Sequence, residues 1–324
     1  MTTFPPLDVR SEVLEAEDRI RLHIRRTPLE PSLWLGQQAG CEVYLKLENL
    51  QITSSFKYRG ALNKILSLGE EERRRGIVTA SSGNHGSAVA YLLRKFGLTG
   101  SIYIPETASS AKVESLRTYG ADLVVYGTDG VETERAARKA AEQEDKVYIS
   151  PYSDPKIIGG QGTIGLELET QLEGIDAVFC PVGGGGLAAG IAGYMKSSDA
   201  QIHFVGCQPR NSDVMYESVK AGHIVDLPSQ TTLADGTAGG IEERAITFPI
   251  CRDRIDKYVL VDEEEIASAI RLMLAKHHLL IEGAAALSVA SFLRHADTYK
   301  GSRVVLIISG ARISLETLRS VLAG

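Results

Sequence analysis

Short apolar segments alternate with amphipathic segments along most of this 324-residue chain. Such alternation is typical of units in which parallel strands are joined by helices that cross over one face of a sheet. Strands are expected at about residues 42–47, 77–80, 101–104, 122–126, 147–150, 176–181, 202–207, 257–261 and 304–308. Helices are expected between them, including residues 86–95, 111–119, 133–143 and 263–276. The alternation therefore predicts an α/β fold with parallel sheets.

The spacing of these segments also predicts two domains. Residues 76–150 hold several strands with short connections, as expected for a compact unit of its own. The segment 152–162 is rich in glycine and contains proline and aspartate, so we expect a hinge there. We expect a small mobile domain at residues 68–153, inserted into a large cofactor-binding domain at residues 1–67 and 154–324. A ligand site would then lie in the cleft between them.

Composition and charge argue against several classes of function. The formal net charge of -6 leaves no basic surface for nucleic acid. Residues 1–21 lack the apolar stretch of a secretory signal, and no apolar run approaches the roughly 20 residues that span a bilayer. The cysteines are widely spaced, as expected for small core residues in a reducing compartment; they are Cys41, Cys180, Cys207 and Cys251. We therefore expect a cytoplasmic protein that binds neither nucleic acid nor a membrane.

A glycine run follows the expected strand at residues 176–181. The run consists of Gly183, Gly184, Gly185 and Gly186, and Leu187 begins a helical segment. Backbone amides at the start of a helix favour a dianionic phosphate, so the run is a candidate phosphate loop. A dinucleotide site is the alternative, because the run also matches Gly-x-Gly-x-x-Ala. That site needs a carboxylate at the end of the next strand, where this chain has Gln208.

A second polar loop follows the expected strand at residues 77–80. It consists of Ser81, Ser82, Gly83, Asn84 and His85, and a helical segment begins near its end. Hydroxyls and amides at a helix N-terminus can bind a substrate carboxylate. The alternative is an ordinary helix cap made by one of the serines, and His85 alone is more typical of a structural histidine. No metal site is expected from these residues.

Lys57 lies in a third loop, between Phe56 and Gly60. A lysine that forms a Schiff base must spend time neutral, which an apolar neighbour and a nearby cation such as Arg59 would favour. The alternative for Arg59 is a structural role. Together, the lysine, the carboxylate loop and the phosphate loop predict an enzyme that uses pyridoxal 5'-phosphate.

The three loops, in this order and spacing, resemble those of the fold-type II pyridoxal phosphate enzymes, in the branch of serine/threonine dehydratases and serine racemases. The resemblance extends from Arg26-Thr27-Pro28-Leu29 to Ser309-Gly310. It implies two open, twisted, mainly parallel sheets with helices on both faces, as in the tryptophan synthase β-like fold. It also implies a homodimeric ammonia-lyase that converts L-threonine, L-serine or a related 3-hydroxy amino acid to a 2-oxo acid and ammonia.

The resemblance also implies roles for individual residues. Lys57 would carry the cofactor covalently and remove the Cα proton of the substrate, with Ser82 as an acid/base on the opposite face. The loop from Ser81 to His85 would hold the substrate carboxylate. The other implied cofactor contacts are Phe56 on the ring, Asn84 at the 3-oxygen, Gly183 to Leu187 on the phosphate, Ser309 at the pyridine nitrogen, and Glu282 close to the site.

Four departures from the family pattern leave alternatives open. Ser82 is typical of the racemases, so serine racemisation is an alternative activity. Gln208 and Val214 stand at two acidic metal-ligand positions, which argues against a bound cation. Arg312 replaces the asparagine of Gly-Gly-Asn, and we expect it to turn outward or to alter substrate choice. Residues 233–240 resemble dehydratases of hydroxyectoine catabolism, so 3-hydroxyaspartate or a hydroxyectoine-derived substrate is a further alternative.

Overall fold

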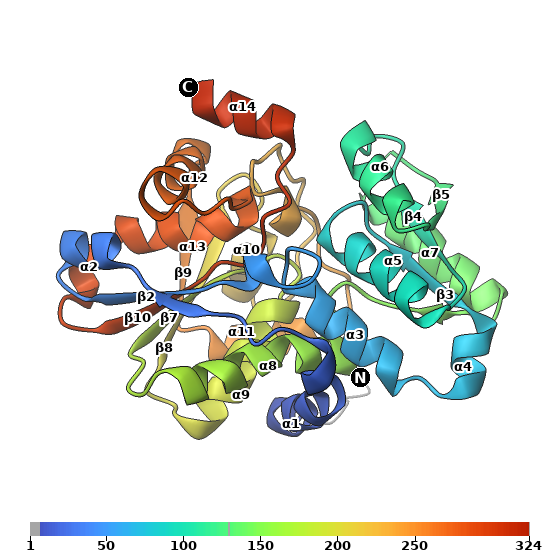
Figure 1. The fold of residues 1–324 in the computed structure, drawn as a ribbon, viewed down its shortest axis with the longest axis horizontal. Coiled ribbons are helices and arrows are strands. Elements are labelled where there is room, and N and C mark those ends of the chain that lie inside the picture. The colour runs from blue at the N-terminus through green and yellow to red at the C-terminus, as the bar shows by residue number, and fades with distance from the viewer. Residues whose placement is uncertain (1–6, 129, 324) are drawn as a thin grey trace.

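The computed structural model describes residues 7–128 and 130–323, which form two sheets with helices around them (Figure 1). The larger sheet has the strand order β1-β2-β10-β7-β8-β9. Its strands are β1 (Leu29–Pro31), β2 (Glu42–Lys46), β7 (Ala177–Pro181), β8 (His203–Pro209), β9 (Lys257–Val261) and β10 (Arg303–Ile307). Neighbouring strands are parallel except for β1, which is antiparallel to β2.

The smaller sheet has the strand order β5-β4-β3-β6, and all its described pairs are parallel. Its strands are β3 (Ile77–Ala80), β4 (Gly100–Ile104), β5 (Asp122–Val125) and β6 (Val147–Tyr148). All nine strands predicted from the sequence are present, and the predicted α/β class with mainly parallel sheets is confirmed. Only β1 was not expected, because an edge strand of three residues ending in Pro31 is too short to show a pattern.

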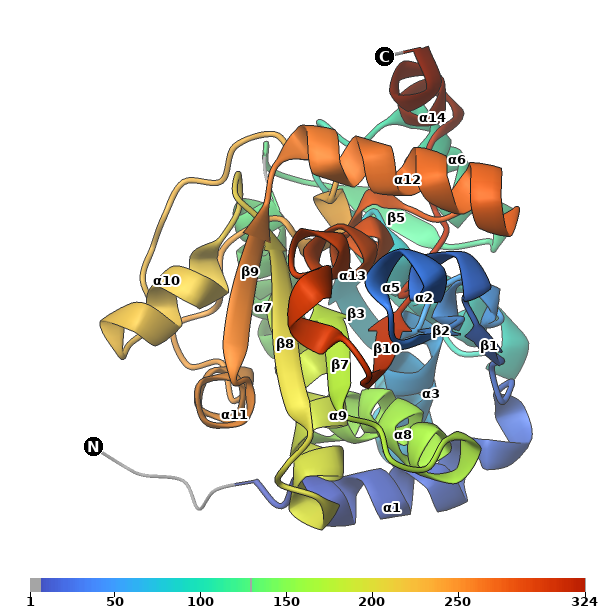
Figure 2. The same ribbon diagram turned by 90° about the vertical axis from the view of Figure 1, so that its left-hand side faces the viewer.

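Helices cover both faces of the larger sheet (Figure 2). One face packs against α2 (Leu33–Ala39), α12 (Glu263–His277) and α13 (Gly283–Arg294). The opposite face packs against α1 (Val9–Ile20), α8 (Pro155–Gln171), α9 (Gly186–Ser198) and α11 (Thr247–Arg254). The central strands are buried on both faces, as expected for parallel strands between two helical layers.

The smaller sheet is covered in the same way. Its helices are α5 (Asn84–Phe96) and α6 (Ser110–Thr118) on one face and α7 (Gly130–Gln143) on the other, while α3 (Lys57–Ser67) packs against α5. The remaining helices are α4 (Glu70–Arg75), α10 (Val214–Ala221) and α14 (Leu315–Ala323). No helix within the described residues is both long and apolar enough to span a membrane.

The prediction of a hinge at residues 152–162 is wrong for most of that segment, because α8 begins at Pro155. Asp154 caps this helix by accepting hydrogen bonds from the backbone N–H groups of Lys156, at 2.8 Å, and Ile157, at 3.3 Å. The glycines of the segment permit close packing rather than bending. A methyl group on Gly160 would lie 2.6 Å from the Cα of Gly60, so α8 can approach α3 only because both residues lack a side chain.

Candidate active site

The carboxyl ends of three adjacent strands bring the predicted site loops together. In the order of the larger sheet, β10 lies between β2 and β7, and all three are parallel. The segment that carries Lys57 follows β2, Ser309 follows β10, and the glycine run follows β7. Loops at the carboxyl ends of parallel strands meet at one edge of the sheet, where ligands of such folds bind.

Backbone hydrogen bonds join two of these loops directly. The N–H of Phe56 donates to the carbonyl of Ser309 at 3.1 Å, and the N–H of Ala311 donates to the carbonyl of Ser54 at 3.0 Å. Ser54 adopts a left-handed backbone, with φ 59°. This pairing places the loop before Lys57 against the loop that contains Ser309.

Lys57 is the first residue of α3, and its side chain is partly buried. Its Nζ donates a hydrogen bond to the carbonyl of Pro151 at 2.7 Å and lies 5.2 Å from the centroid of the Phe56 ring. Burial lowers the pKa of Lys57 to about 8, against the charges of Glu134 and Glu282, which raise it. A lysine with this pKa is neutral in roughly one molecule in ten at pH 7, far more often than an ordinary lysine, as Schiff-base chemistry requires.

Arg59 does not lower the pKa of Lys57, contrary to one expectation from the sequence. Its fully buried guanidinium binds Glu48 through Nε and Nη2, at 2.8 Å each. It also binds Glu167 through Nη1, at 2.9 Å, and Nη2, at 3.0 Å. Residues two apart on a helix point to different sides. The alternative, a structural role for Arg59, is the one that the contacts support.

The glycine run forms the turn into α9, as expected of a phosphate loop. Gly185 is the N-cap residue of α9 and has φ 88°, a left-handed backbone that glycine adopts without strain. A methyl group on Gly184 would lie 2.5 Å from the Tyr152 ring, so the loop needs glycine there to pass the ring. The Oγ1 of Thr247 donates to the carbonyl of Gly184 at 2.6 Å. The loop therefore ends at a helix N-terminus, where backbone N–H groups are available to an anion.

The serine loop connects the end of β3 to α5. The Oγ of Ser81 accepts a hydrogen bond from the N–H of Gly83 at 3.2 Å. Gly83 itself is the N-cap residue of α5, and no side chain caps that helix end. The alternative of an ordinary serine cap is therefore wrong. Ser81, Ser82, Gly83 and Asn84 are all partly exposed, as residues that meet a ligand must be.

His85 is buried behind this loop. Its Nε2 lies 3.3 Å from the carbonyl of Ile149, and burial, together with the charge of Lys57, lowers its pKa to about 3. The imidazole is therefore neutral at physiological pH and cannot act as a cationic acid. This environment fits a structural histidine more closely than a residue that holds the substrate carboxylate.

Glu282 connects the serine loop to the loop after β10. Its Oε1 accepts a hydrogen bond from the Nδ2 of Asn84 at 2.7 Å, and its Oε2 accepts one from the N–H of Arg312 at 2.9 Å. A methyl group on Gly310 would lie 2.5 Å from the carboxylate. Burial, reinforced by the charge of Asp235, raises the pKa of Glu282 to about 7. The carboxyl group is thus poised to exchange a proton near neutral pH.

Several buried polar atoms in these loops have no hydrogen-bond partner among the described residues. They include the Oγ of Ser309, the Oδ1 of Asn84 and the Nδ1 of His85. A buried polar atom without a partner costs free energy, and a ligand that supplies the partner is one explanation for such an atom. Together with the amine of Lys57 and the glycine run, these atoms fit a ligand with an aldehyde, a ring nitrogen and a phosphate. That set of groups is the one in pyridoxal 5'-phosphate.

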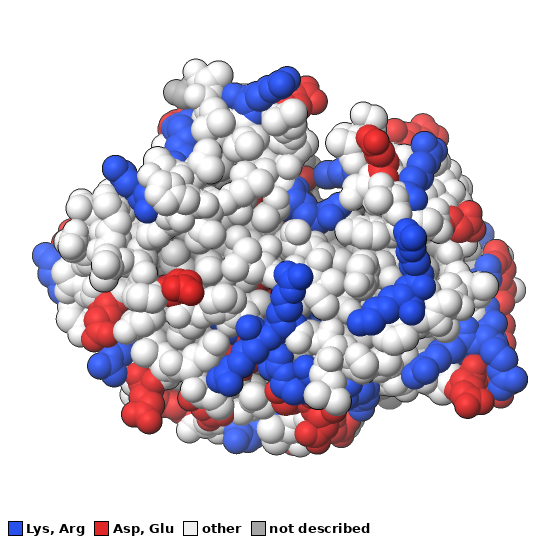
Figure 3. Space-filling view, viewed as in Figure 1, with Lys and Arg blue, Asp and Glu red and all other residues white. Residues whose placement is uncertain are grey.

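The side chain of Arg312 reaches across the cleft rather than turning outward. Its Nη2 donates to the Oγ of Ser115 on α6. A second contact across the same cleft is the ion pair of Lys112 and Asp235, at 2.7 Å. Figure 3 shows basic side chains in the hollow between the two parts of the molecule. These contacts fasten α6 to segments that follow the strands of the larger sheet.

Several polar residues linked to the segment that binds Lys57 were not recognised from the sequence. Glu134 and Arg138 lie on α7, Tyr148 ends β6, Tyr152 follows it, and Glu242 precedes α11. No motif marks them, because they come from separate segments that only the fold brings together.

The residues at the acidic metal-ligand positions form ordinary structural contacts. The Oε1 of Gln208 accepts a hydrogen bond from the N–H of Tyr216 at 2.8 Å, and Val214 begins α10. Within the described ranges, no group of three or more His, Cys, Asp or Glu side chains is arranged to hold a metal ion. The absence of a metal from this enzyme stays a prediction.

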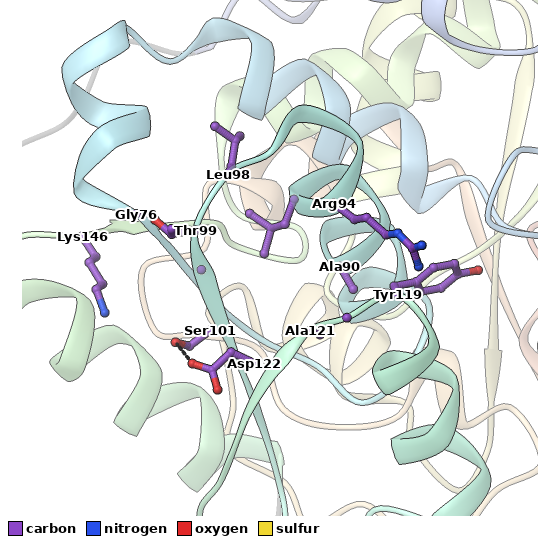
Figure 4. Close-up of a pocket in the computed structure, with 13 residues that line it drawn as sticks. Gly76, Ala90, Arg94, Leu98, Thr99, Ser101, Tyr119, Ala121, Asp122 and Lys146 are labelled. Carbon is purple, nitrogen blue, oxygen red and sulfur yellow. Dashed lines mark hydrogen bonds between the residues drawn. The ribbon is translucent and has the colours of Figure 1, made fainter.

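A surface pocket of about 530 Å³ lies away from these loops, at the amino ends of β3, β4 and β5 (Figure 4). Its lining includes Arg94, Lys146 and the hydrogen-bonded pair of Ser101 and Asp122, whose oxygens are 3.1 Å apart. The lining includes no residue of the lysine, serine or glycine loops. The pocket is therefore separate from the candidate active site.

The chain is similar to known proteins over almost its whole length. It is 38% identical to the L-threonine ammonia-lyase of Geobacter sulfurreducens over 310 residues, which cover 95% of this chain and 77% of that protein. A threonine deaminase from Solanum lycopersicum has a matching structure, with a TM-score of 0.91, 32% identity, and coverage of 98% of this chain and 95% of that chain. Maize serine racemase matches with a TM-score of 0.90 and 31% identity, over 97% of this chain and 96% of that chain.

A family model described as "Pyridoxal-phosphate dependent enzyme" matches residues 20–310. The match spans all three loops, from the lysine loop to Ser309 and Gly310. It agrees with the groups that the loops offer to a cofactor. The chain therefore belongs to the family of pyridoxal-phosphate-dependent enzymes.

Proposed function

We propose that this enzyme is an ammonia-lyase that converts L-threonine, L-serine or a related 3-hydroxy amino acid to a 2-oxo acid and ammonia. The observation that carries the proposal is the amine of Lys57, whose pKa is lowered to about 8, beside the glycine run and Ser309. The L-threonine ammonia-lyase of Geobacter sulfurreducens, at 38% identity, supports the reaction class.

Each loop has one task in the proposed reaction. The cofactor, when bound, withdraws electrons from the Cα of the substrate. Lys57 would hold it, with Phe56 beside its ring, and the amides from Gly183 to Leu187 would bind its phosphate. The free Nζ of Lys57 would remove the Cα proton of the substrate as a general base.

The remaining site residues tune and position these groups. The hydroxyl of Ser309 would donate a hydrogen bond to the ring nitrogen of the cofactor. A hydroxyl is too weak an acid to protonate that nitrogen fully. The withdrawal of electrons is therefore moderate, which suits expulsion of a β-hydroxyl. Asn84, oriented by Glu282, would bind the 3-oxygen of the cofactor, and the serine loop would bind the substrate carboxylate.

We further propose that residues 68–153 act as a small mobile domain against residues 1–67 and 154–324. The smaller sheet carries the serine loop, while the larger sheet carries Lys57 and Ser309, so closure would bring the carboxylate site onto the cofactor site. Closure of this kind excludes water from the reacting atoms. We also infer a cytoplasmic location and a homodimer; sedimentation of the purified protein would test the homodimer.

Replacement of one lysine tests the proposed function. Purified enzyme should show the absorbance band of a cofactor bound to lysine and should release a 2-oxo acid from threonine or serine. Lys57→Ala should lose both, whereas the control Lys139→Ala, at an exposed position of α7, should keep both. Enzyme that binds no pyridoxal phosphate, or a Lys57→Ala variant that keeps full activity, would refute the proposal.

A racemase activity is the second candidate. Ser82 takes no part in capping α5, so its hydroxyl is available to the face of the substrate opposite Lys57, and maize serine racemase has a closely similar fold. Chiral analysis of L-serine incubated with the enzyme should then reveal D-serine. Ser82→Ala should stop its formation while some elimination persists. An enzyme that forms no D-serine lacks this second activity.

A further inference from the structure

A set of polar side chains lies next to the carbonyl that binds Lys57. That carbonyl belongs to Pro151, which follows Tyr148 by three residues and directly precedes Tyr152. The ring of Tyr152 packs against Gly184 in the glycine run, and its hydroxyl accepts a hydrogen bond from the N–H of Glu242 at 2.9 Å. The segment 148–152 therefore connects the reacting lysine, the glycine run and the loop before α11.

Arg138 connects this segment to two carboxylates. Its Nη2 donates to Glu134 at 2.9 Å and also donates to Glu242. Its Cζ lies 4.3 Å from the centroid of the Tyr148 ring, in a cation–π contact. We call Glu134, Arg138, Tyr148, Tyr152 and Glu242 the acidic wall of the site.

The acidic wall is negative overall, because two carboxylates share one guanidinium. The side chains of Glu134 and Glu242 are 23% and 25% exposed, so water screens their charges only in part. The charge of Glu134 acts on Lys57 and raises its pKa, against the larger effect of burial. A group attached to the carbon next to Cα would be held near Lys57 and would experience the same field.

We propose that the acidic wall selects 3-hydroxy amino acids whose side chain ends in a cationic group such as an amine. This inference rests on the proposed elimination and names its substrate class. An ammonium would complete the charge balance of the wall. The methyl group of threonine would instead exclude water from Glu134 and Glu242, and it could not replace the hydrogen bonds that water makes to these carboxylates.

An anionic substituent fits the wall poorly. The one guanidinium within the wall, that of Arg138, is already shared by Glu134 and Glu242, so a third carboxylate would add a like charge without a cation of the wall left to pair with it. The tyrosine hydroxyls do not change this balance, because they carry no charge at neutral pH. The wall therefore favours an amine over the carboxylate of 3-hydroxyaspartate.

Three substrates that differ only at C4 test this preference in the holoenzyme. They are L-threonine, 2,4-diamino-3-hydroxybutyrate, which is threonine with an amine on C4, and 3-hydroxyaspartate. We expect kcat/KM to be at least about tenfold higher for the diamine than for threonine, and lowest for 3-hydroxyaspartate. A ratio of diamine to threonine at or below one would overturn the proposal.

Glu134→Gln identifies the residue responsible. The ratio of kcat/KM for the diamine over threonine should fall about tenfold in this variant, and Glu134→Asp should retain most of the preference. The ratio cancels any common effect of the variant on Lys57. The control Glu142→Gln removes an exposed carboxylate from the same helix and should leave the ratio as it is. An unchanged ratio in Glu134→Gln would contradict the assignment.

Equilibrium binding provides a readout that does not depend on turnover. The substrate analogue 2,4-diaminobutyrate lacks the leaving hydroxyl, and its binding shifts the absorbance of the bound cofactor. It should bind more tightly than 2-aminobutyrate, and Glu134→Gln should remove the difference. If the enzyme forms no 2-oxo acid from any of the three substrates, the proposed elimination fails, while this titration still decides whether the wall prefers a cation.

Discussion

Glu282 has the most perturbed carboxyl group in the site, and its environment makes stability depend on pH. Burial raises its pKa from 4.5 to about 7. Between these values the folded protein retains a proton that the unfolded chain has released, so stability falls as pH rises from about 4.5 through 7. The side chain is 3% exposed, so solvent screens this effect little.

Glu282→Gln should remove this dependence, because glutamine does not titrate and can still accept a hydrogen bond. The free energy of unfolding of the wild type, relative to the variant, should fall by roughly 3 kcal/mol between pH 4.5 and pH 8. Urea unfolding at several pH values, with cofactor saturation held constant, measures the difference. A difference that does not change over this range would show that Glu282 has an ordinary pKa.

The position of α3 depends on a buried ion cluster. Arg59 is bound by Glu48 and Glu167, and Glu167 also accepts a hydrogen bond from the Nζ of Lys46 at 2.6 Å. All these side chains are at most 1% exposed. Because Arg59 follows Lys57 by two residues on the same helix, the cluster fixes the helix end from which the reacting amine projects.

Arg59→Met should destabilise the protein by about 3–5 kcal/mol, because it leaves the buried carboxylates of Glu48 and Glu167 with fewer cationic partners. The control Arg75→Met breaks the ion pair with Asp145, whose side chains are 37% and 80% exposed, and should cost at most about 1 kcal/mol. Urea unfolding compares the two variants. Equal losses would mean that the buried cluster contributes no more than a surface pair.

Most elements follow from patterns of neighbouring residues. The strands at 77–80 and 177–181 are short apolar runs between turn residues. The spacing of their apolar residues and the length of each run predict them directly. The edge strand β1 and the helical start at Pro155 were not predicted. Glycines within 152–162 resemble a flexible segment in the sequence, but they serve packing against α1, α3 and α9, and these partners are distant in the chain.

At the scale of the whole molecule, side-chain contacts join the two sheets across the cleft. Three of them involve α6 or α7: Arg312 binds Ser115, Lys112 pairs with Asp235, and Arg138 pairs with Glu242. A further contact joins Asn84, at the start of α5, to the buried Glu282. Contacts of partly exposed side chains are weak individually, so α6 and α7 can separate from these segments at low cost in free energy.

Arg312→Ala should loosen α6 without unfolding the protein. The variant removes the contact with Ser115 but keeps the backbone bond to Glu282. Amide hydrogen exchange in residues 110–118 should become several times faster, while exchange in β7 should stay the same. Equal protection of α6 in both proteins would show that Arg312 does not hold the cleft closed.

The sequence alone determined the α/β class, the parallel strands and the three loops, because each depends on neighbouring residues and on glycine, serine or lysine at short spacing. Only the tertiary structure decided which groups meet at Lys57. In the folded protein, Arg59 lies in a buried ion cluster and Glu282 binds Asn84. The acidic wall is formed by residues of α7, β6 and the loop before α11. Contacts between segments that are far apart in the chain leave no local pattern, since burial and charge balance arise only when the segments pack together.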